Sequence, residues 1–148
     1  MVTTTVVRIT HEALDAALRG DAAGAVDLLA DLAGTIPDDD LEAVARLLAQ
    51  AAVAAVYRTR GRVLDADEMW VLTVAPGAAE RAPELLWAYR YLTAAGNRDT
   101  GTTDALWAAV AGRGRDRTIR ALCDLAGAAA RVTLDTRLGT RGSALTIR

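Results

Sequence analysis

Apolar residues recur every three to four positions along most of the chain, which is the spacing that places them on one face of a helix. Glycines that commonly end helices separate the periodic stretches, among them Gly20, Gly34, Gly96 and Gly112. Ala accounts for 33 of the residues, and its high helix propensity supports the same interpretation. We predict helices at residues 11–19, 21–34, 39–58, 69–74, 83–96, 103–112 and 116–137.

The helix predicted at residues 39–58 is apolar on nearly every face. The only polar residues in its long apolar run are Glu42, Arg46 and Gln50, which are four apart and therefore form one narrow stripe. The acidic residues 38–40 suit its first turn, because they complement the positive end of the helix dipole. We expect this helix either in the centre of a bundle or in an oligomer interface.

Three segments carry weaker patterns. Residues 1–9 are rich in β-branched side chains, which fits a short strand or an extended arm, and we favour the arm. Residues 69–74 are also β-branched, but Asp65 and Glu68 have capping-box spacing, so we favour a helix. The prediction is an all-α, single-domain bundle of six or seven short-to-medium helices. It has an extended arm at 1–9, a helical domain at 10–138 and a polar C-terminal tail at 139–148.

Two stretches of the chain are similar to each other. Residues 11–34 and 103–127 each contain a short helix, a glycine and a second helix, and their apolar positions match at offsets of 92 and 93 residues. Two related helical hairpins would explain this similarity. Chance is the alternative explanation, because Ala- and Leu-rich helices look alike.

The composition restricts the class and the location. The 148 residues suit one domain, and 52% hydrophobic against 24% charged residues is too apolar for a disordered chain. No apolar run approaches the roughly 20 residues that cross a membrane, so we expect no membrane insertion. Neither a signal-peptide pattern nor a pair of cysteines is present, so we expect a cytoplasmic protein. All 17 basic residues are Arg, a usage that resembles proteins from GC-rich bacterial genomes.

The residues that usually carry catalysis are scarce. His11 and Cys123 are the only His and Cys, which leaves no ligand set for zinc or haem, and Cys123 lies in an apolar helical run. Ser143 is the only Ser and has no nucleophile-elbow context. The acidic run 38–40 lacks the spacing of a calcium loop. We therefore expect no catalytic, metal or cofactor site, and we lean against an enzyme.

Charge is distributed unevenly along the chain. Residues 1–56 contain three Arg against nine acidic residues, whereas residues 57–148 contain 14 Arg against ten. Such opposite charges would steer two copies toward each other. Pairing with acidic residues of the same chain is the plain explanation for the arginines of the second part. Four of them also form a candidate contact for nucleic acid or another anion: Arg113, Arg115, Arg117 and Arg120.

The aromatic residues all lie in the middle of the chain. They are candidates for an interface or an apolar ligand pocket, although core packing is the favoured explanation because the chain has no Phe. The candidates are Tyr57, Trp70, Trp87, Tyr89, Tyr91 and Trp107.

These patterns favour a non-catalytic helical module that binds a protein partner or assembles with copies of itself. The nearly all-apolar helix at 39–58 and the uneven charge are the main reasons. A small nucleic-acid-associated regulator that uses the Arg cluster is the alternative, and a bundle that binds an apolar small molecule is a third class.

Overall fold

The computed structural model describes residues 2–73, 77, 80, 82–139 and 145–148. About 76% of these described residues are helical, which confirms the prediction of an all-α bundle. No helix within the described ranges is both long and apolar enough to cross a lipid bilayer. The helices are α1 (Thr4–Leu18), α2 (Ala22–Thr35), α3 (Asp38–Arg60), α5 (Pro83–Gly96), α6 (Thr100–Ala111) and α7 (Arg115–Leu138), and the strands are β1 (Trp70–Leu72) and β2 (Leu145–Ile147).

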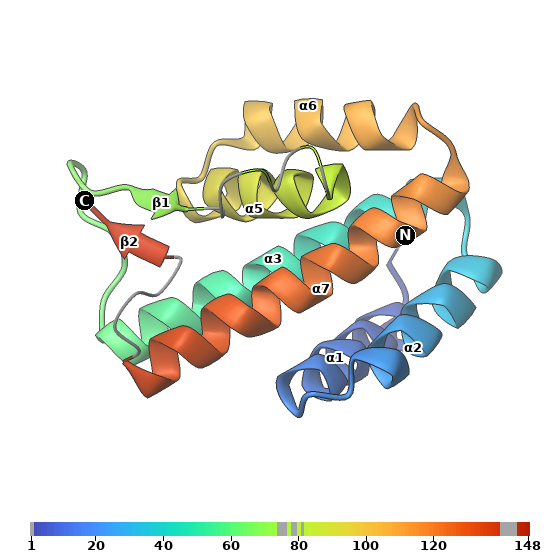
Figure 1. Cartoon of the computed structure of the whole chain (residues 1–148), viewed down its shortest axis with the longest axis horizontal. Helices are drawn as coiled ribbons and strands as arrows, with labels where there is room; N and C mark the ends of the chain where they lie inside the picture. The colour runs from blue at the N-terminus through green and yellow to red at the C-terminus, as the bar shows by residue number, and fades with distance from the viewer. Residues whose placement is uncertain (1, 74–76, 78–79, 81, 140–144) are drawn as a thin grey trace.

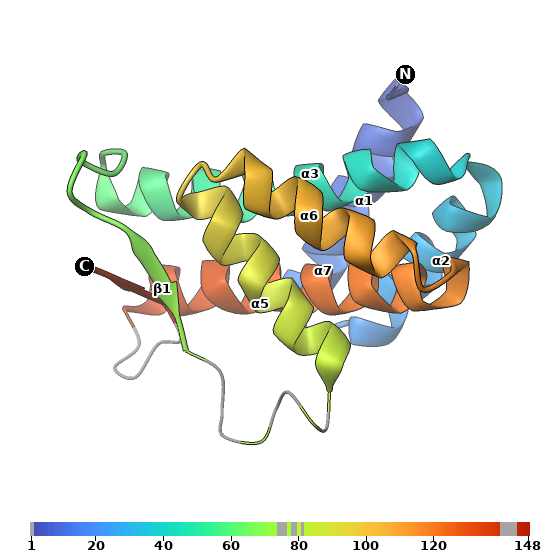
Figure 2. The same ribbon diagram turned by 90° about the horizontal axis from the view of Figure 1, so that it is seen from above.

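Helices α3 and α7 form the middle of the molecule. They lie side by side and run in the same direction, so their N-termini meet at one end and both C-termini lie near the strands (Figure 1). The α1–α2 hairpin packs on one side of this pair, and α5 and α6 pack on the other (Figure 1). Figure 2 shows that α5 crosses the pair obliquely. The core therefore lies where these three layers meet on α3 and α7.

The long apolar helix α3 is buried within its own chain. Its polar stripe has the predicted orientation, because Arg46 and Gln50 are exposed and Glu42 is half-buried. Most of its other residues pack into the bundle, so α3 lies in the centre of a bundle, which is one of the two positions predicted for it. The structure therefore gives no support to α3 as an oligomer interface. Its buried residues are Leu41, Val44, Ala45, Leu48, Ala49, Ala52, Ala55 and Val56.

The extended arm predicted at residues 1–9 is wrong, because α1 begins at Thr4. The Thr3 hydroxyl accepts a hydrogen bond from the Val6 amide at 3.3 Å and caps the helix. Val6 is buried, and Thr10 lies inside the helix and donates its hydroxyl to the Val6 carbonyl at 2.7 Å. Burial of the apolar face thus outweighs the local β-branched preference.

The helix predicted at residues 69–74 is also wrong, because Trp70–Leu72 is a strand. It pairs antiparallel with Leu145–Ile147, a segment predicted as part of a polar tail. Asn97 supports the free edge of β1: its side-chain carbonyl accepts from the Trp70 amide at 2.6 Å, and its amide donates to the Trp70 carbonyl at 3.1 Å. Both partners of Trp70 are distant in the sequence, so a local pattern could not reveal them.

The two similar stretches both fold as helix pairs, α1–α2 and α6–α7. Their second helices bury corresponding positions, for example Leu29 of α2 and Leu122 of α7. Their first helices pack differently, because α1 buries five residues and α6 buries only Val110. A duplicated hairpin therefore stays a prediction.

Candidate functional site

The four arginines of the predicted cluster have different environments, and Arg115 is part of the fold. Its guanidinium donates to the carbonyl oxygens of Ala33 and Ile36, the latter at 3.0 Å, and it forms an ion pair with Asp38. These contacts satisfy carbonyl groups at the C-terminal end of α2. Arg115 therefore ties α7 to α2 and to the first residue of α3, which agrees with the expectation that some arginines pair within the chain.

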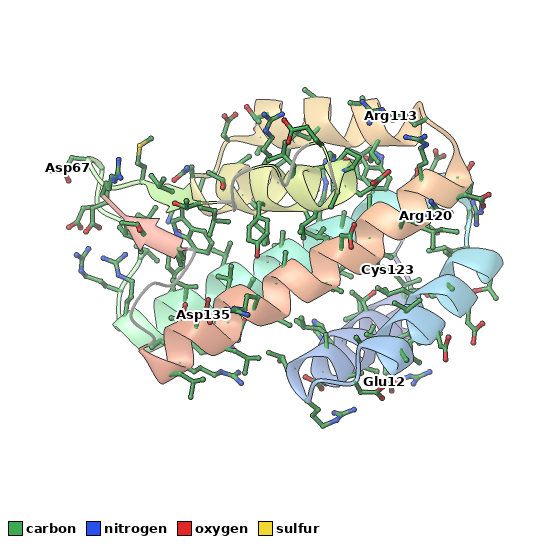
Figure 3. All side chains as sticks on the ribbon, in the orientation of Figure 1. Glu12, Asp67, Arg113, Arg120, Cys123 and Asp135 are labelled. Atoms are coloured by element: carbon green, nitrogen blue, oxygen red, sulfur yellow. The ribbon has the colours of Figure 1, made fainter. Side chains whose placement is uncertain are left out.

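The other three arginines are exposed at the same end of the molecule. Arg117 approaches Glu84 of α5, with 3.9 Å between its Nη1 and the carboxylate oxygen. Arg113 and Arg120 form no ion pair with the described part of the chain, and Figure 3 shows both near the junction of α6 and α7. All four arginines of the predicted cluster line one open concavity at the start of α7, but only Arg115 is bonded to the end of α2.

Two of these exposed arginines line a groove between α5, α6 and the start of α7. Arg113 and Arg117 are joined there by Arg90 of α5, against a single carboxylate, Glu84. The groove has a volume of about 280 Å³ and is open to solvent. Its apolar floor consists of Leu86, Trp87, Leu106 and Val110. We call this site the arginine groove.

The floor of the arginine groove is held together by Trp87. Its indole Nε1 donates to the Leu106 carbonyl at 2.7 Å and thereby links α5 to α6. The ring packs against Tyr91, with 5.1 Å between the ring centroids. Because the polar end of the indole is satisfied, the groove presents an apolar floor beneath a positively charged rim. Such a site favours a partner that combines acidic and small apolar side chains.

Arg90 was not among the residues predicted from the sequence. The sequence could have indicated Arg90, because Pro83, Trp87 and Arg90 are spaced four and three residues apart and therefore lie on one face of α5. The chemistry of the groove depends on three helices, however, and α6 and α7 contribute residues that are about twenty positions or more away in the sequence.

The aromatic residues fill the core at separate places. Trp70 is buried and meets Tyr57 edge to face, with 6.4 Å between the ring centroids. The Tyr57 hydroxyl donates to the Gly96 carbonyl at 3.2 Å. Tyr91 is buried, and this burial raises the pKa of its phenol to about 12. The first of these pairs lies at the strands, away from the arginine groove.

The remaining two aromatic residues are only partly buried. Tyr89 and Trp107 both pack against the core from its edge. Tyr89 lies on a different face of α5 from Tyr91, as their spacing of two residues predicts. Of the six aromatic candidates, only Trp87 lines the arginine groove, so the structure does not gather them into one pocket.

The residues considered for nucleophilic or metal chemistry do not come together. His11 lines a groove between α1, α3 and α7, whereas Cys123 lines a different one between α2, α5 and α7. Burial, with a smaller contribution from Asp124, raises the pKa of the Cys123 thiol. Within the described ranges, no three His, Cys, Asp or Glu residues are placed to hold a metal ion. The acidic residues 38–40 form the first turn of α3.

The outer face of α2 has the opposite chemistry to the arginine groove. Asp27 and Asp31 are exposed there, one turn apart, and neither forms an ion pair with a described residue. The helix contains no basic residue. Three small residues are exposed around these two carboxylates, Ala23, Ala30 and Gly34, and the exposed Val26 borders them. We call this surface the acidic α2 face.

Comparisons with protein-family models, with curated proteins and with solved structures found no match to this chain.

Proposed function

We propose that this protein is a non-catalytic interaction module that self-associates, with the acidic α2 face of one copy bound in the arginine groove of another. The observation that carries the proposal is the presence of two exposed helical surfaces of opposite charge on one chain. One surface presents Asp27 and Asp31, and the other presents Arg90, Arg113 and Arg117.

The shapes of the two surfaces support the same pairing. Three small residues, Ala23, Ala30 and Gly34, surround the carboxylates of the acidic α2 face, so this part of the helix backbone can approach a groove closely. Ala23 and Ala30 would lie over the apolar floor, and the carboxylates would reach the arginine rim. Arg–carboxylate pairs are often bidentate and fix the register of a contact as well as its strength.

The acidic α2 face and the arginine groove of one copy cannot contact each other. The α1–α2 hairpin and the α5–α6 pair lie on opposite sides of the α3–α7 pair (Figure 1). Two copies related by a twofold axis would form the contact twice, and each pair of surfaces would add to the association. The opposite charges would also speed the encounter of the copies at low salt.

A charge swap tests the proposal. The groove variant combines Arg90→Glu with Arg113→Glu, and the helix variant combines Asp27→Arg with Asp31→Arg. Each variant then has two surfaces of equal sign, so each should be monomeric alone in light scattering after size-exclusion chromatography. An equimolar mixture pairs both surfaces again and should restore the mass of the parent assembly. Arg58→Glu, an exposed change at the far end of α3, is the control and should leave the assembly intact.

The salt dependence of the parent protein completes the test. The assembly should be present in about 0.1 M salt and dissociate toward monomer in about 1 M salt, where charges are screened beyond about 3 Å. A parent that is monomeric in both salts contradicts the proposal, as does a mixture of variants that stays monomeric. Nucleic acid that copurifies with the parent and is lost in the groove variant would instead assign the arginines to a phosphate backbone.

A further inference from the structure

A second groove lies over α7, between α2 and α5, and differs in chemistry from the arginine groove. It has a volume of about 480 Å³, and most of its lining consists of small or apolar side chains. Val26 forms part of the α2 wall, Leu85 forms part of the α5 wall, and Gly127 and Ala128 lie on the α7 floor. Cys123, labelled on α7 in Figure 3, lies on the same floor. We call this site the apolar groove.

Asp124 places one negative charge in the apolar groove. Its side chain is half-buried, and no described residue forms a hydrogen bond or an ion pair with it. Burial, with a smaller contribution from the negatively charged Glu84, raises the pKa of this carboxyl. A carboxylate that is partly removed from water and lacks a partner is costly, and a bound cation would recover part of that cost.

The other charges of the apolar groove do not neutralise Asp124. Arg131 is the cation that lines the groove, but it is paired with Asp135 one turn further along α7, at 3.1 and 3.2 Å. Asp135 is buried, whereas the Arg131 side chain is largely exposed. The groove therefore retains one uncompensated negative charge beside an extended apolar surface.

We propose that the apolar groove binds a small hydrophobic ammonium ion, with the ammonium group on the Asp124 carboxylate and the hydrocarbon along Val26, Leu85 and Ala128. A volume of this size is in the range of small-molecule sites, and apolar walls with one placed charge are typical of them. Val26 borders the acidic α2 face, but the site shares no charged residue with the surfaces proposed for self-association, so either proposal can fail without the other.

Three probes of equal chain length separate charge from hydrophobicity: octylamine, which is an ammonium ion at neutral pH, octanol and octanoate. Amide chemical shifts in ¹H–¹⁵N NMR spectra report both the affinity and the place of binding. We expect octylamine to shift the amides of Val26, Asp124 and Gly127, with an affinity about fivefold above that of octanol, which corresponds to about 1 kcal/mol for the added charge pair. Octanoate should bind more weakly than octanol.

Two variants test the assigned roles. Asp124→Asn should lower octylamine binding to the level of octanol, whereas Asp116→Asn, an exposed change on α7 outside the apolar groove, should leave it unchanged. Gly127→Leu fills the floor, where an added side chain meets open space, and should block all three probes while the helix remains folded. Equal binding of octylamine and octanol, an unchanged affinity in Asp124→Asn, or shifts confined to another surface would overturn the proposal.

Discussion

The contact between Gly96 and Trp70 makes a quantitative prediction about the strand end of the molecule. Gly96 ends α5 directly beneath the buried indole of Trp70. A methyl group added at Gly96 would overlap the indole ring: its Cβ would lie only 2.6 Å from Cε3 and 2.7 Å from Cε2. Real Cβ atoms do not approach a neighbour this closely. The Gly96→Ala variant must therefore displace the ring of Trp70 or the end of α5.

The change in the free energy of unfolding caused by Gly96→Ala is the sum of two opposing effects. Replacing Gly by Ala in a helix stabilises it by up to about 1 kcal/mol, and less at the last residue of a helix. Forcing a methyl group into a packed core costs about 1–3 kcal/mol. Trp70 has little room to move, because Tyr57 contacts its ring edge to face and Asn97 holds its backbone through two hydrogen bonds. We expect Gly96→Ala to lower the free energy of unfolding by about 1–2 kcal/mol.

Gly127 provides the matched control. It lies in the middle of α7, and an added Cβ there meets no atom within 4 Å. Gly127→Ala should therefore raise the free energy of unfolding by about 0.5–1 kcal/mol. Urea denaturation followed by circular dichroism measures both values. In a Trp70→Leu background, Gly96→Ala should cost less than in the parent, because a smaller side chain relieves the overlap.

A Gly96→Ala variant as stable as the parent would refute the assigned packing. The same conclusion follows if the cost of Gly96→Ala is unchanged in the Trp70→Leu background. If the changes in the free energy of unfolding have opposite signs at Gly96 and Gly127, a general effect of adding a methyl group to a helix is excluded.

Three further predictions concern charged and ionisable groups. Arg115→Ala should lower the free energy of unfolding by about 1–2 kcal/mol through loss of its bonds to the end of α2, whereas Arg113→Ala should change it by less than about 0.5 kcal/mol in the same urea experiment. Equal effects would contradict the separate roles of these two arginines. Hydrogen bonds from Arg62 and from the Asp65 amide lower the pKa of Glu68 to about 2 from an ordinary value of 4.5, so the folded state binds the proton more weakly than the unfolded chain. The stability contributed by Glu68 should be present above about pH 4.5 and be lost as the pH falls toward 2, and Glu68→Gln should reduce the difference between denaturation curves at pH 7 and pH 3. The raised pKa of Cys123 predicts slower alkylation by iodoacetamide at pH 8 in the folded protein than in urea, and equal rates would contradict its burial.

The helices were predictable from the sequence because the patterns that indicate a helix involve residues close together in the chain. An apolar period of three to four residues and a following glycine are properties of neighbouring positions, and both survive in the fold. The sheet was not predictable in this way. Trp70 and Ile147 pair across more than seventy residues, and neither segment has a partner within reach of a local pattern. The errors at the strand and at the C-terminal segment therefore have one physical cause.

The capping-box signal before β1 illustrates a different limit. The hydrogen bond that the spacing predicts does form, since the Asp65 amide donates to the Glu68 carboxylate at 2.9 Å. The same carboxylate also accepts from Arg62 at 2.8 Å and from Arg60 at 3.1 Å. These arginines fix a turn in place of the first turn of a helix. A local motif thus predicted a contact correctly and its structural consequence wrongly.

The division of the Arg cluster follows from helix geometry. Arg115 and Arg117 are two residues apart at the start of α7, so their side chains point to nearly opposite sides of the helix. One side faces the end of α2, and the other faces α5 and the arginine groove. Nearness in the sequence therefore placed these arginines at one end of the molecule without giving them one function.

The carboxylates of the acidic first half must likewise be divided into those already bonded within the chain and those open to a second molecule. Asp21 caps α2 by accepting from the Gly24 amide at 2.9 Å, and Asp38 is occupied by Arg115. Asp27 and Asp31 are left on the exposed face of a helix that has no cation of its own. The sign of a surface can be read from the sequence, but which charges are available to a second molecule depends on the hydrogen bonds and ion pairs that the fold has already used. Two such unpaired carboxylates lie together on α2, and Arg90 and Arg113 line the arginine groove without an ion pair to a described residue. These two surfaces make self-association the proposal with the most direct test.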